Sequence, residues 1–234
     1  MESIIGALIM LIMLYILIPL LQQVMEAMAK VAPPPEEEAP PEAGFSDDFD
    51  DNVTDPDLWE TFHYGSNTVQ ETGGRVDINC QDAIGNDAGY VTKDARDLTG
   101  KTSQVDIDMD AVSSLYAVLH YSPEKTSGAT DHSIIDHADL YRIQYSKGDS
   151  KLKVVKKEGG AQTNLYEGTV ATCTKLRIRE SGGTIYFEYY NGTSWIIACS
   201  DTTPSWLTNA YIYLAGSVSA GHAGHVYFDN FSLT

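Results

Sequence analysis

The pattern of hydrophobic and polar positions changes twice along the chain. Residues 3–25 carry no charge, and the stretch from Ile4 to Leu21 is almost entirely apolar. As a helix, these 23 residues would reach roughly 35 Å, which is enough to cross a bilayer core of about 30 Å. No cationic leader precedes the run, so it is not typical of a cleaved signal peptide. We therefore predict a long hydrophobic helix over residues 1–30, either a membrane anchor or the core of a filament.

Residues 31–44 read VAPPPEEEAPPEAG, with five Pro and four Glu and nothing to bury. Prolines favour an extended polyproline conformation, and neighbouring glutamates repel one another. This segment is predicted to be a stiff spacer that holds the following domain away from the helix.

From residue 45 onward, short runs of alternating apolar and polar residues are separated by turn residues. Residues 105–110 alternate Val, Ile and Met with aspartates, as in a half-buried strand. Turns are predicted at residues 146–150, at Gly182-Gly183 and at Asn191-Gly192, where the last pair is a strong hairpin signal. Eight or more such strands predict an all-β domain over residues 45–234, an antiparallel β-sandwich or jelly roll.

Composition narrows the classes of function. The chain has 33 Asp and Glu against 15 Lys and Arg, a formal charge of −18, which argues against nucleic-acid binding. Hydrophobic residues make up 43 % of the chain, which suffices for one sizeable core. Three cysteines are too few for a disulfide framework, and the sequence leaves open whether Cys173 and Cys199 pair.

Three motifs carry a family resemblance. Residues 45–50 read FSDDFD, residues 55–59 read DPDLW and residues 226–233 read VYFDNFSL. Together they resemble the concanavalin A-like lectin/glucanase superfamily over residues 45–234, and the resemblance implies a jelly roll. It also implies one structural calcium ion where the first and last strands meet, with oxygen ligands from Asp47, Asp50 and Asp229. The alternative is that these carboxylates only cap turns.

The same resemblance raises the question of catalysis. Laminarinase-type members carry E-x-D-x-E on one strand face, whereas residues 106–110 read DIDMD, with the right spacing but shorter side chains in the outer places. A misplacement of about one bond length can cost on the order of 100-fold in rate. We therefore expect a solvent-facing acidic strand, and no enzymatic activity.

Other candidate sites are less specific. Trp206, Tyr121 and Tyr64 are candidates for stacking on a sugar ring, with packing in the core or at its rim as the alternative. Sequons place candidate glycosylation sites at Asn52 and Asn191. Residues 131–139 and 221–225 gather histidines that could bind a transition metal, but their spacing matches no ligand motif, so hydrated loops are expected.

The overall plan, a hydrophobic N-terminal helix and a β-rich head, resembles archaeal type IV pilins. The resemblance implies a structural subunit of an extracellular, pilus-like filament, with a lectin-like, adhesive outer domain and with surface glycans as partners. Copies of the helix would pack together, and the membrane would be contacted at least transiently. The alternatives are a membrane-anchored lectin at the cell surface and a virion surface protein. The residues expected in the assembly contacts are Ile4, Ile5, Leu8, Leu11, Tyr15, Leu17 and Leu21.

Overall fold

A computed structural model describes residues 15, 17–19, 21–23, 44–81, 86–130 and 133–234. Tyr15, Leu17 and Leu21 are helical and at least half exposed. The remainder of the predicted hydrophobic helix, including Ile4, Ile5, Leu8 and Leu11, and nearly all of the spacer lie outside the described residues. Within the described part of the chain, no helix is long and apolar enough to cross a membrane. The resemblance to pilins therefore has no support from the structure.

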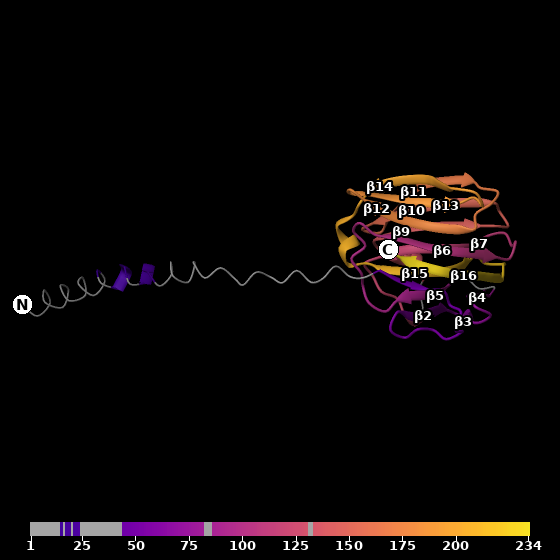
Figure 1. Cartoon of the computed structure of the whole chain (residues 1–234), viewed down its shortest axis with the longest axis horizontal. Helices are drawn as coiled ribbons and strands as arrows, with labels where there is room; N and C mark the ends of the chain where they lie inside the picture. The colour runs from indigo at the N-terminus through magenta and orange to yellow at the C-terminus, as the bar shows by residue number, and fades with distance from the viewer. Residues whose placement is uncertain (1–14, 16, 20, 24–43, 82–85, 131–132) are drawn as a thin grey trace, which may run out of the picture. The chain divides into compact units, whose positions relative to one another are not determined.

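The β domain is a sandwich of two sheets (Figure 1). Sheet A has the strand order β14-β13-β12-β6-β16-β4-β3, and β1 pairs with β16 beside this path. Its strands are β1 (Phe45–Asp47), β3 (Thr68–Glu71), β4 (Val76–Cys80), β6 (Thr102–Met109), β12 (Lys175–Ser181), β13 (Thr184–Tyr190), β14 (Trp195–Thr202) and β16 (Gly224–Leu233).

Sheet B has the order β11-β10-β9-β7-β15-β5-β2-β8. All of its pairs are antiparallel except β2 with β8. Its strands are β2 (Trp59–Tyr64), β5 (Asn86–Thr92), β7 (Leu115–Ser122), β8 (Gly128–Thr130), β9 (Leu140–Ser146), β10 (Lys151–Glu158), β11 (Ala161–Thr169) and β15 (Tyr211–Val218). The predicted all-β sandwich is confirmed.

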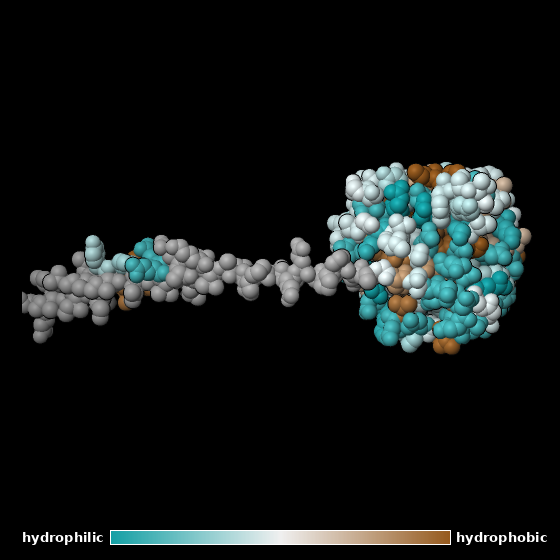
Figure 2. All heavy atoms as spheres, in the orientation of Figure 1, coloured by the Kyte–Doolittle hydropathy of each residue, from teal (hydrophilic) through white to brown (hydrophobic). Residues whose placement is uncertain are grey.

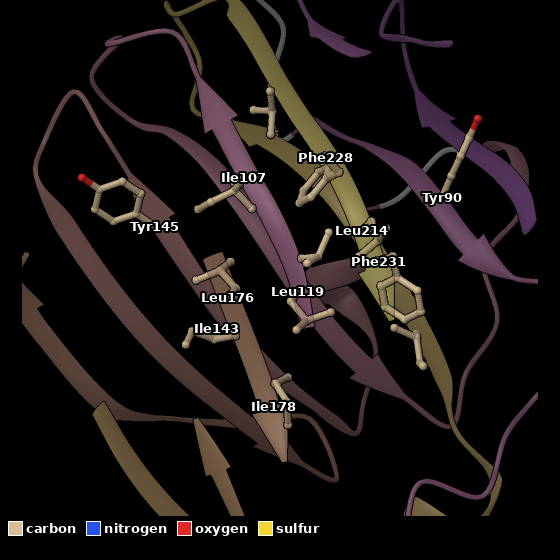
Figure 3. Packing of buried hydrophobic residues seen from close by; sticks show 14 of the residues in the cluster. Tyr90, Ile107, Leu119, Ile143, Tyr145, Leu176, Ile178, Leu214, Phe228 and Phe231 are labelled. Carbon is tan, nitrogen blue, oxygen red and sulfur yellow. The ribbon is translucent and has the colours of Figure 1, made fainter. Parts of the chain in front are cut away.

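The core lies between the two sheets, where each strand turns every second side chain inward. Figure 3 shows Ile107, Leu176 and Phe228 of sheet A packed in one layer with Leu119 and Leu214 of sheet B. All five are at most 7 % exposed, so the alternation seen in the sequence marks the buried face correctly.

The predicted turns connect neighbouring strands. Residues 147–150 join β9 to β10, Gly182 and Gly183 join β12 to β13, and Asn191 and Gly192 join β13 to β14. Both Gly182 and Gly183 have positive φ, which a residue with a Cβ rarely adopts. These short connections fix the register of the hairpins.

The outer faces of the two sheets differ. Sheet A turns charged residues toward solvent, whereas sheet B carries a second, smaller apolar cluster on its outer face. A segment of the chain packs on this cluster: residues 123–130 and 133–139, which include β8 and the 3-10 helix η1 (Ile134–Asp136), and which we call the strap. The cluster consists of Phe62, Val91, Val118, Ile134, Tyr213 and Ala215.

Candidate functional site

A cavity of about 560 Å³ lies between residues 46–58 and strands β6 and β16; we call it the N-terminal cavity. Carboxylates, amides and hydroxyls dominate its lining, with a few apolar side chains. Its walls are formed by Ser46, Asp47, Asp48, Asp50, Asp51, Val53, Asp55, Leu58, Gln104, Asn230, Phe231 and Ser232. The cavity exists because β1 pairs with β16 and the following loop folds back over that pair.

Asp47 holds this loop in place. Its Oδ1 accepts a hydrogen bond from the Phe49 backbone N–H, and its Oδ2 accepts one from Trp59 Nε1, each at 2.9 Å. Burial raises the pKa of Asp47 in spite of these two bonds, and the charges of Asp51 and Asp55 add to the increase. Asp47 therefore acts as the anchor of the loop.

The predicted calcium site is not formed by the described side chains. Asp47 and Asp229 do lie at the junction of β1 and β16, and Asp229 Oδ1 accepts the Asn230 backbone N–H at 2.7 Å. Among the described residues, however, no three Asp, Glu, His or Cys side chains are grouped so that they could hold a metal ion. Asp50 lies in the loop and its Oδ1 faces Gly74. As they are placed in the structure, these three carboxylates do not form a set that would hold the ion.

Glu71, at the end of β3, lies behind the cavity wall. Its Oε1 accepts the Val53 backbone N–H at 3.1 Å, and its Oε2 accepts the Tyr90 hydroxyl at 3.2 Å. Burial raises the pKa of Glu71 to about 7, with a contribution from its hydrogen bond to Asp51 and from the charges of Asp47 and Asp51. The sequence did not predict this raised pKa of Glu71, because the raised value depends on neighbours from separate segments of the chain.

A second hollow, of about 160 Å³, opens on the outer face of sheet A. It is lined by Arg75, Asp106, Ile107, Asp108, Tyr227, Phe228 and Asp229. Asp106 of β6 lies directly opposite Asp229 of β16. Lys175 Nζ approaches Asp106 Oδ1 at 2.7 Å, whereas burial, followed by the charges of Asp106, Asp50 and Asp48, raises the pKa of Asp229. Asp106 is thus paired with a cation, whereas the pKa of Asp229 is raised.

The other two aspartates of the predicted acidic strand are also engaged. Burial is the largest single influence on Asp108 and raises its pKa, but the hydrogen bonds from Lys147 Nζ, at 2.9 Å, and from the Met109 N–H, with the charges of Lys147 and Arg75, together lower the pKa. Asp110 Oδ2 accepts the His225 backbone N–H at 2.9 Å. Side chains 106, 108 and 110 do face outward from β6, as the alternation predicts.

The three candidate sugar-stacking residues are not brought together. Tyr121 is 2 % exposed, and its hydroxyl bonds Ser103 Oγ inside the core, so its ring is not available to a ligand. Trp206 lies in η2 (Ser205–Asn209) and packs against Tyr141, with ring centroids 5.8 Å apart. Tyr64 ends β2, and the strand register places it at the opposite end of sheet B from Tyr141.

The predicted glycosylation sites are both exposed turn residues. Asn52 donates through Nδ2 to the Asp50 carbonyl and accepts the Gly74 N–H. Asn191 accepts the backbone N–H groups of Thr193 and Ser194, each at 2.9 Å. No observation tests their modification, and it stays a prediction.

The histidine-rich segments differ from the expected hydrated loops. His137 is 3 % exposed within the strap, and its Nε2 bonds Thr126 Oγ1 at 2.9 Å. His225 Nδ1 lies 2.7 Å from Asp77 Oδ1. Residues 131 and 132 lie outside the described part of the chain. The prediction of a solvated loop is therefore wrong for His137, because its segment packs on sheet B.

Beneath the strap, sheet B carries buried polar side chains that the sequence analysis missed. Asp87 of β5, His120 of β7 and Arg142 of β9 are each at most 2 % exposed. Arg142 Nη2 lies 3.9 Å from Asp87 Oδ1. In the sequence they occupy the polar positions of alternating strands, which suggests exposure, so no local signal could have identified them.

Comparisons with known proteins agree on the fold. No family model matches the sequence, and no curated protein matches it significantly. One similar solved structure comes from work on endo-acting O-glycanases, which members of the human gut microbiota express to initiate mucin breakdown. It matches with a TM-score of 0.58 at 13 % sequence identity, and the match covers 81 % of this chain and 98 % of that one. The laminarinase catalytic domain from Thermotoga maritima gives 0.57 at 12 % identity, covering 81 % and 96 %.

The exoplasmic/lumenal domain of VIP36, in a form bound to Ca²⁺ and Man3GlcNAc, gives a TM-score of 0.56 at 13 % identity, covering 75 % of this chain and 82 % of that one. The β domain thus shares the jelly-roll fold of these lectin and glycoside hydrolase structures, as the motifs implied. The prediction that the chain is not an enzyme is corrected: its structural neighbours include glycoside hydrolases, so the absence of a laminarinase-type motif in one strand did not justify it.

Proposed function

We propose that the β domain is a carbohydrate-binding domain and that the N-terminal cavity holds the sugar. The cavity carries the proposal: its volume of about 560 Å³ lies within the range of small-molecule sites, roughly 300–1,000 Å³. The shared fold supports it, since VIP36 is described in complex with mannose-containing sugars.

The lining suits a neutral or amino sugar. Sugar hydroxyls donate hydrogen bonds, and the carboxylates of Asp48 and Asp51 together with the side-chain oxygen of Gln104 accept them. Val53 and Leu58 offer apolar surface for the C–H face of a ring. The negative charge of the cavity disfavours sugars that carry carboxylate or sulfate groups.

Glycan-array screening of the full chain, followed by calorimetric titration with the best ligand, tests this proposal. Gln104→Ala and Asp48→Asn remove acceptors from the wall, and each is expected to weaken binding about tenfold or more. Glu167→Gln, an exposed change on β11 of sheet B, is the matched control and leaves the affinity unchanged. Absence of binding to every neutral and amino sugar, or equal affinities for all variants, contradicts the proposal.

We also propose a second function, glycoside hydrolysis at the hollow on sheet A. Directly opposed residues of an antiparallel pair have Cβ atoms about 5 Å apart, so the carboxyl groups of Asp106 and Asp229 can approach each other to the distance of about 5 Å that retaining glycosidases use. Asp229, with its raised pKa, would serve as the acid, and Asp106, paired with Lys175, as the carboxylate. Release of reducing ends from neutral polysaccharides, lost in Asp229→Asn and in Asp106→Asn but kept in Asp136→Asn, supports it; no release by the unaltered chain rejects it.

We infer for the N-terminal segment an anchoring or assembly role at the cell surface. The apolar run of residues 3–25 supports this inference, and it lies largely outside the described residues. Negative-stain microscopy of the full chain and of a chain that begins at residue 44 tests it. Filaments formed only by the full chain favour self-association, whereas dispersed particles that float with liposomes favour a single anchor.

A further inference from the structure

Two buried polar side chains on sheet B lack hydrogen-bond partners. Arg142 is 2 % exposed and His120 is 0 % exposed, and the strand register places them directly opposite each other on β9 and β7. Neither Nε nor Nη1 of Arg142, and neither ring nitrogen of His120, has a partner in the part of the chain that the structure describes. Buried polar groups are almost always satisfied, by protein, water or a bound ligand. These four atoms therefore point to a group that occupies the space beside them.

The charges around these residues indicate the sign of that group. Asp87 is the buried carboxylate facing Arg142, but the distance of 3.9 Å is too long for a hydrogen bond, and its other oxygen accepts the Ser133 hydroxyl. Lys157 adds a second cation, which donates to the Ile135 carbonyl at 2.5 Å. Asp136, whose Oδ2 accepts the Ser133 N–H at 3.2 Å, offsets Lys157. The sign therefore follows from Arg142 itself, because its unpaired Nε and Nη1 can only donate and favour a negatively charged acceptor.

His120 is suited to donate to an anion without adding to the charge. Burial lowers the pKa of His120 well below its usual value, and the charges of His137, Arg142 and Lys157 lower it further. The ring is therefore neutral near pH 7, with one nitrogen a donor and the other an acceptor. Its neighbours His137 and Tyr213 contact it ring edge to ring face, at centroid distances of 5.4 and 5.0 Å.

We propose that Arg142 and His120 form an internal binding site for a small oxyanion, a carboxylate or a phosphate group, beneath the strap. The oxygens would accept from the guanidinium and imidazole N–H groups, and the hydrogen bonds to the guanidinium would be charge-assisted, which those of a water molecule are not. This site is separate from the N-terminal cavity and does not depend on the carbohydrate proposal.

Binding there would hold the strap on sheet B. The strap is already tied by the Thr126 N–H to the Tyr213 hydroxyl at 2.9 Å, and by Ser133 to Asp87. An anion enclosed between strap and sheet is released only when the strap opens. The ligand consequently stabilises the closed form in proportion to its concentration above its Kd.

The test is thermal unfolding of the full chain in sodium formate, sodium phosphate and sodium chloride at equal ionic strength. At a hundred times Kd, we expect the unfolding midpoint to rise by about 5 °C or more over chloride. A rise in formate alone identifies a carboxylate as the ligand, and a rise in phosphate alone identifies a phosphate group. The same midpoint in all three salts overturns the proposal.

Variants assign the effect to the site. The double variant Arg142→Met with Asp87→Asn removes both buried charges together, a replacement that proteins often tolerate, and it should lose the anion-dependent rise. Arg179→Gln, on the outer face of sheet A, removes an arginine elsewhere and should keep the rise in full. A rise that persists in the double variant overturns the proposal. If the double variant does not fold, Arg142→Lys takes its place and should weaken anion binding about tenfold.

Discussion

The outer faces of the two sheets present similar residue types in opposite surroundings. On sheet A, Arg177 and Arg179 lie on an open face, pair with Glu188 and stack on aromatic rings. On sheet B, Arg142 lies beneath the strap, with a carboxylate at 3.9 Å. Figure 2 shows the predominantly hydrophilic surface of the domain in one view. The comparison teaches that strand alternation distinguishes inner from outer side chains but does not tell whether an outer face meets water.

The difference has an energetic consequence. An arginine that remains partly in water loses little when its partner is removed, because solvent and salt screen the charge. A buried arginine is not screened by solvent. When a buried arginine is replaced, the carboxylate that remains is buried without a counter-charge, which is strongly destabilising. Substitutions beneath the strap should therefore change stability more than substitutions on the open face of sheet A.

Replacing the buried arginine should have the largest effect. Arg142→Ala leaves Asp87 buried without a counter-charge, and we expect a loss of about 3–5 kcal/mol in the free energy of unfolding. Arg179→Ala on sheet A should cost about 1 kcal/mol or less. Denaturant titration of both variants measures the difference, and equal losses would show that the strap does not exclude water.

A pH titration should separate buried from exposed carboxyl groups. The pKa of Glu71 is raised to about 7, so the folded state holds the proton more tightly than the unfolded chain. Its contribution to stability is complete below about pH 4.5 and is lost as the pH rises to about 7. We expect a decrease of about 3 kcal/mol over this interval, since one pH unit between two pKa values corresponds to about 1.4 kcal/mol.

Glu71→Gln should remove most of that decrease, because the amide keeps the shape and does not ionise. Asp108→Asn on the open face is the control: Lys147 lowers the pKa of Asp108, so this group acts only below its unfolded pKa of about 4. Unfolding midpoints of both variants and of the unaltered chain, measured between pH 4.5 and 8, test this prediction. A Glu71→Gln variant with the same pH dependence as the unaltered chain would refute the assignment.

The smallest expected effect concerns the fastening of the strap. The Tyr213 hydroxyl donates to the Glu124 carbonyl at 2.7 Å and accepts the Thr126 N–H at 2.9 Å. Tyr213→Phe should cost about 1–2 kcal/mol, because one backbone donor is left buried and unsatisfied. Hydrogen exchange at Thr126 should accelerate more than exchange in β12. Tyr227→Phe, on sheet A, should change neither.

Much of the fold follows from local sequence signals. Alternation over residues 105–110 identifies β6 and its inward side, and Asn191-Gly192 marks the β13–β14 turn. Each of these signals depends on neighbours within a few residues. The motifs at residues 45–50 and 226–233 go further, since they correctly imply that the first and last strands meet.

The candidate sites were less predictable, because they depend on segments far apart in the chain. Arg142 and His120 occupy positions that read as exposed, and only the strap buries them. The sequence could not show that Tyr121 lies in the core and Trp206 at its rim, because this depends on the register of β7 and on the position of η2. The Asp106–Asp229 pair is invisible in the sequence, since more than a hundred residues separate its members.

The position of β16 has a consequence for biosynthesis. This strand lies between β6 and β4 inside sheet A and also pairs with β1, yet it comes after all three of these strands in the chain. Until it emerges, β6, β4 and β1 each lack a neighbour and expose hydrogen-bonding edges. The nascent domain therefore cannot complete its core before β16 has been synthesised, and until then the exposed edges favour aggregation.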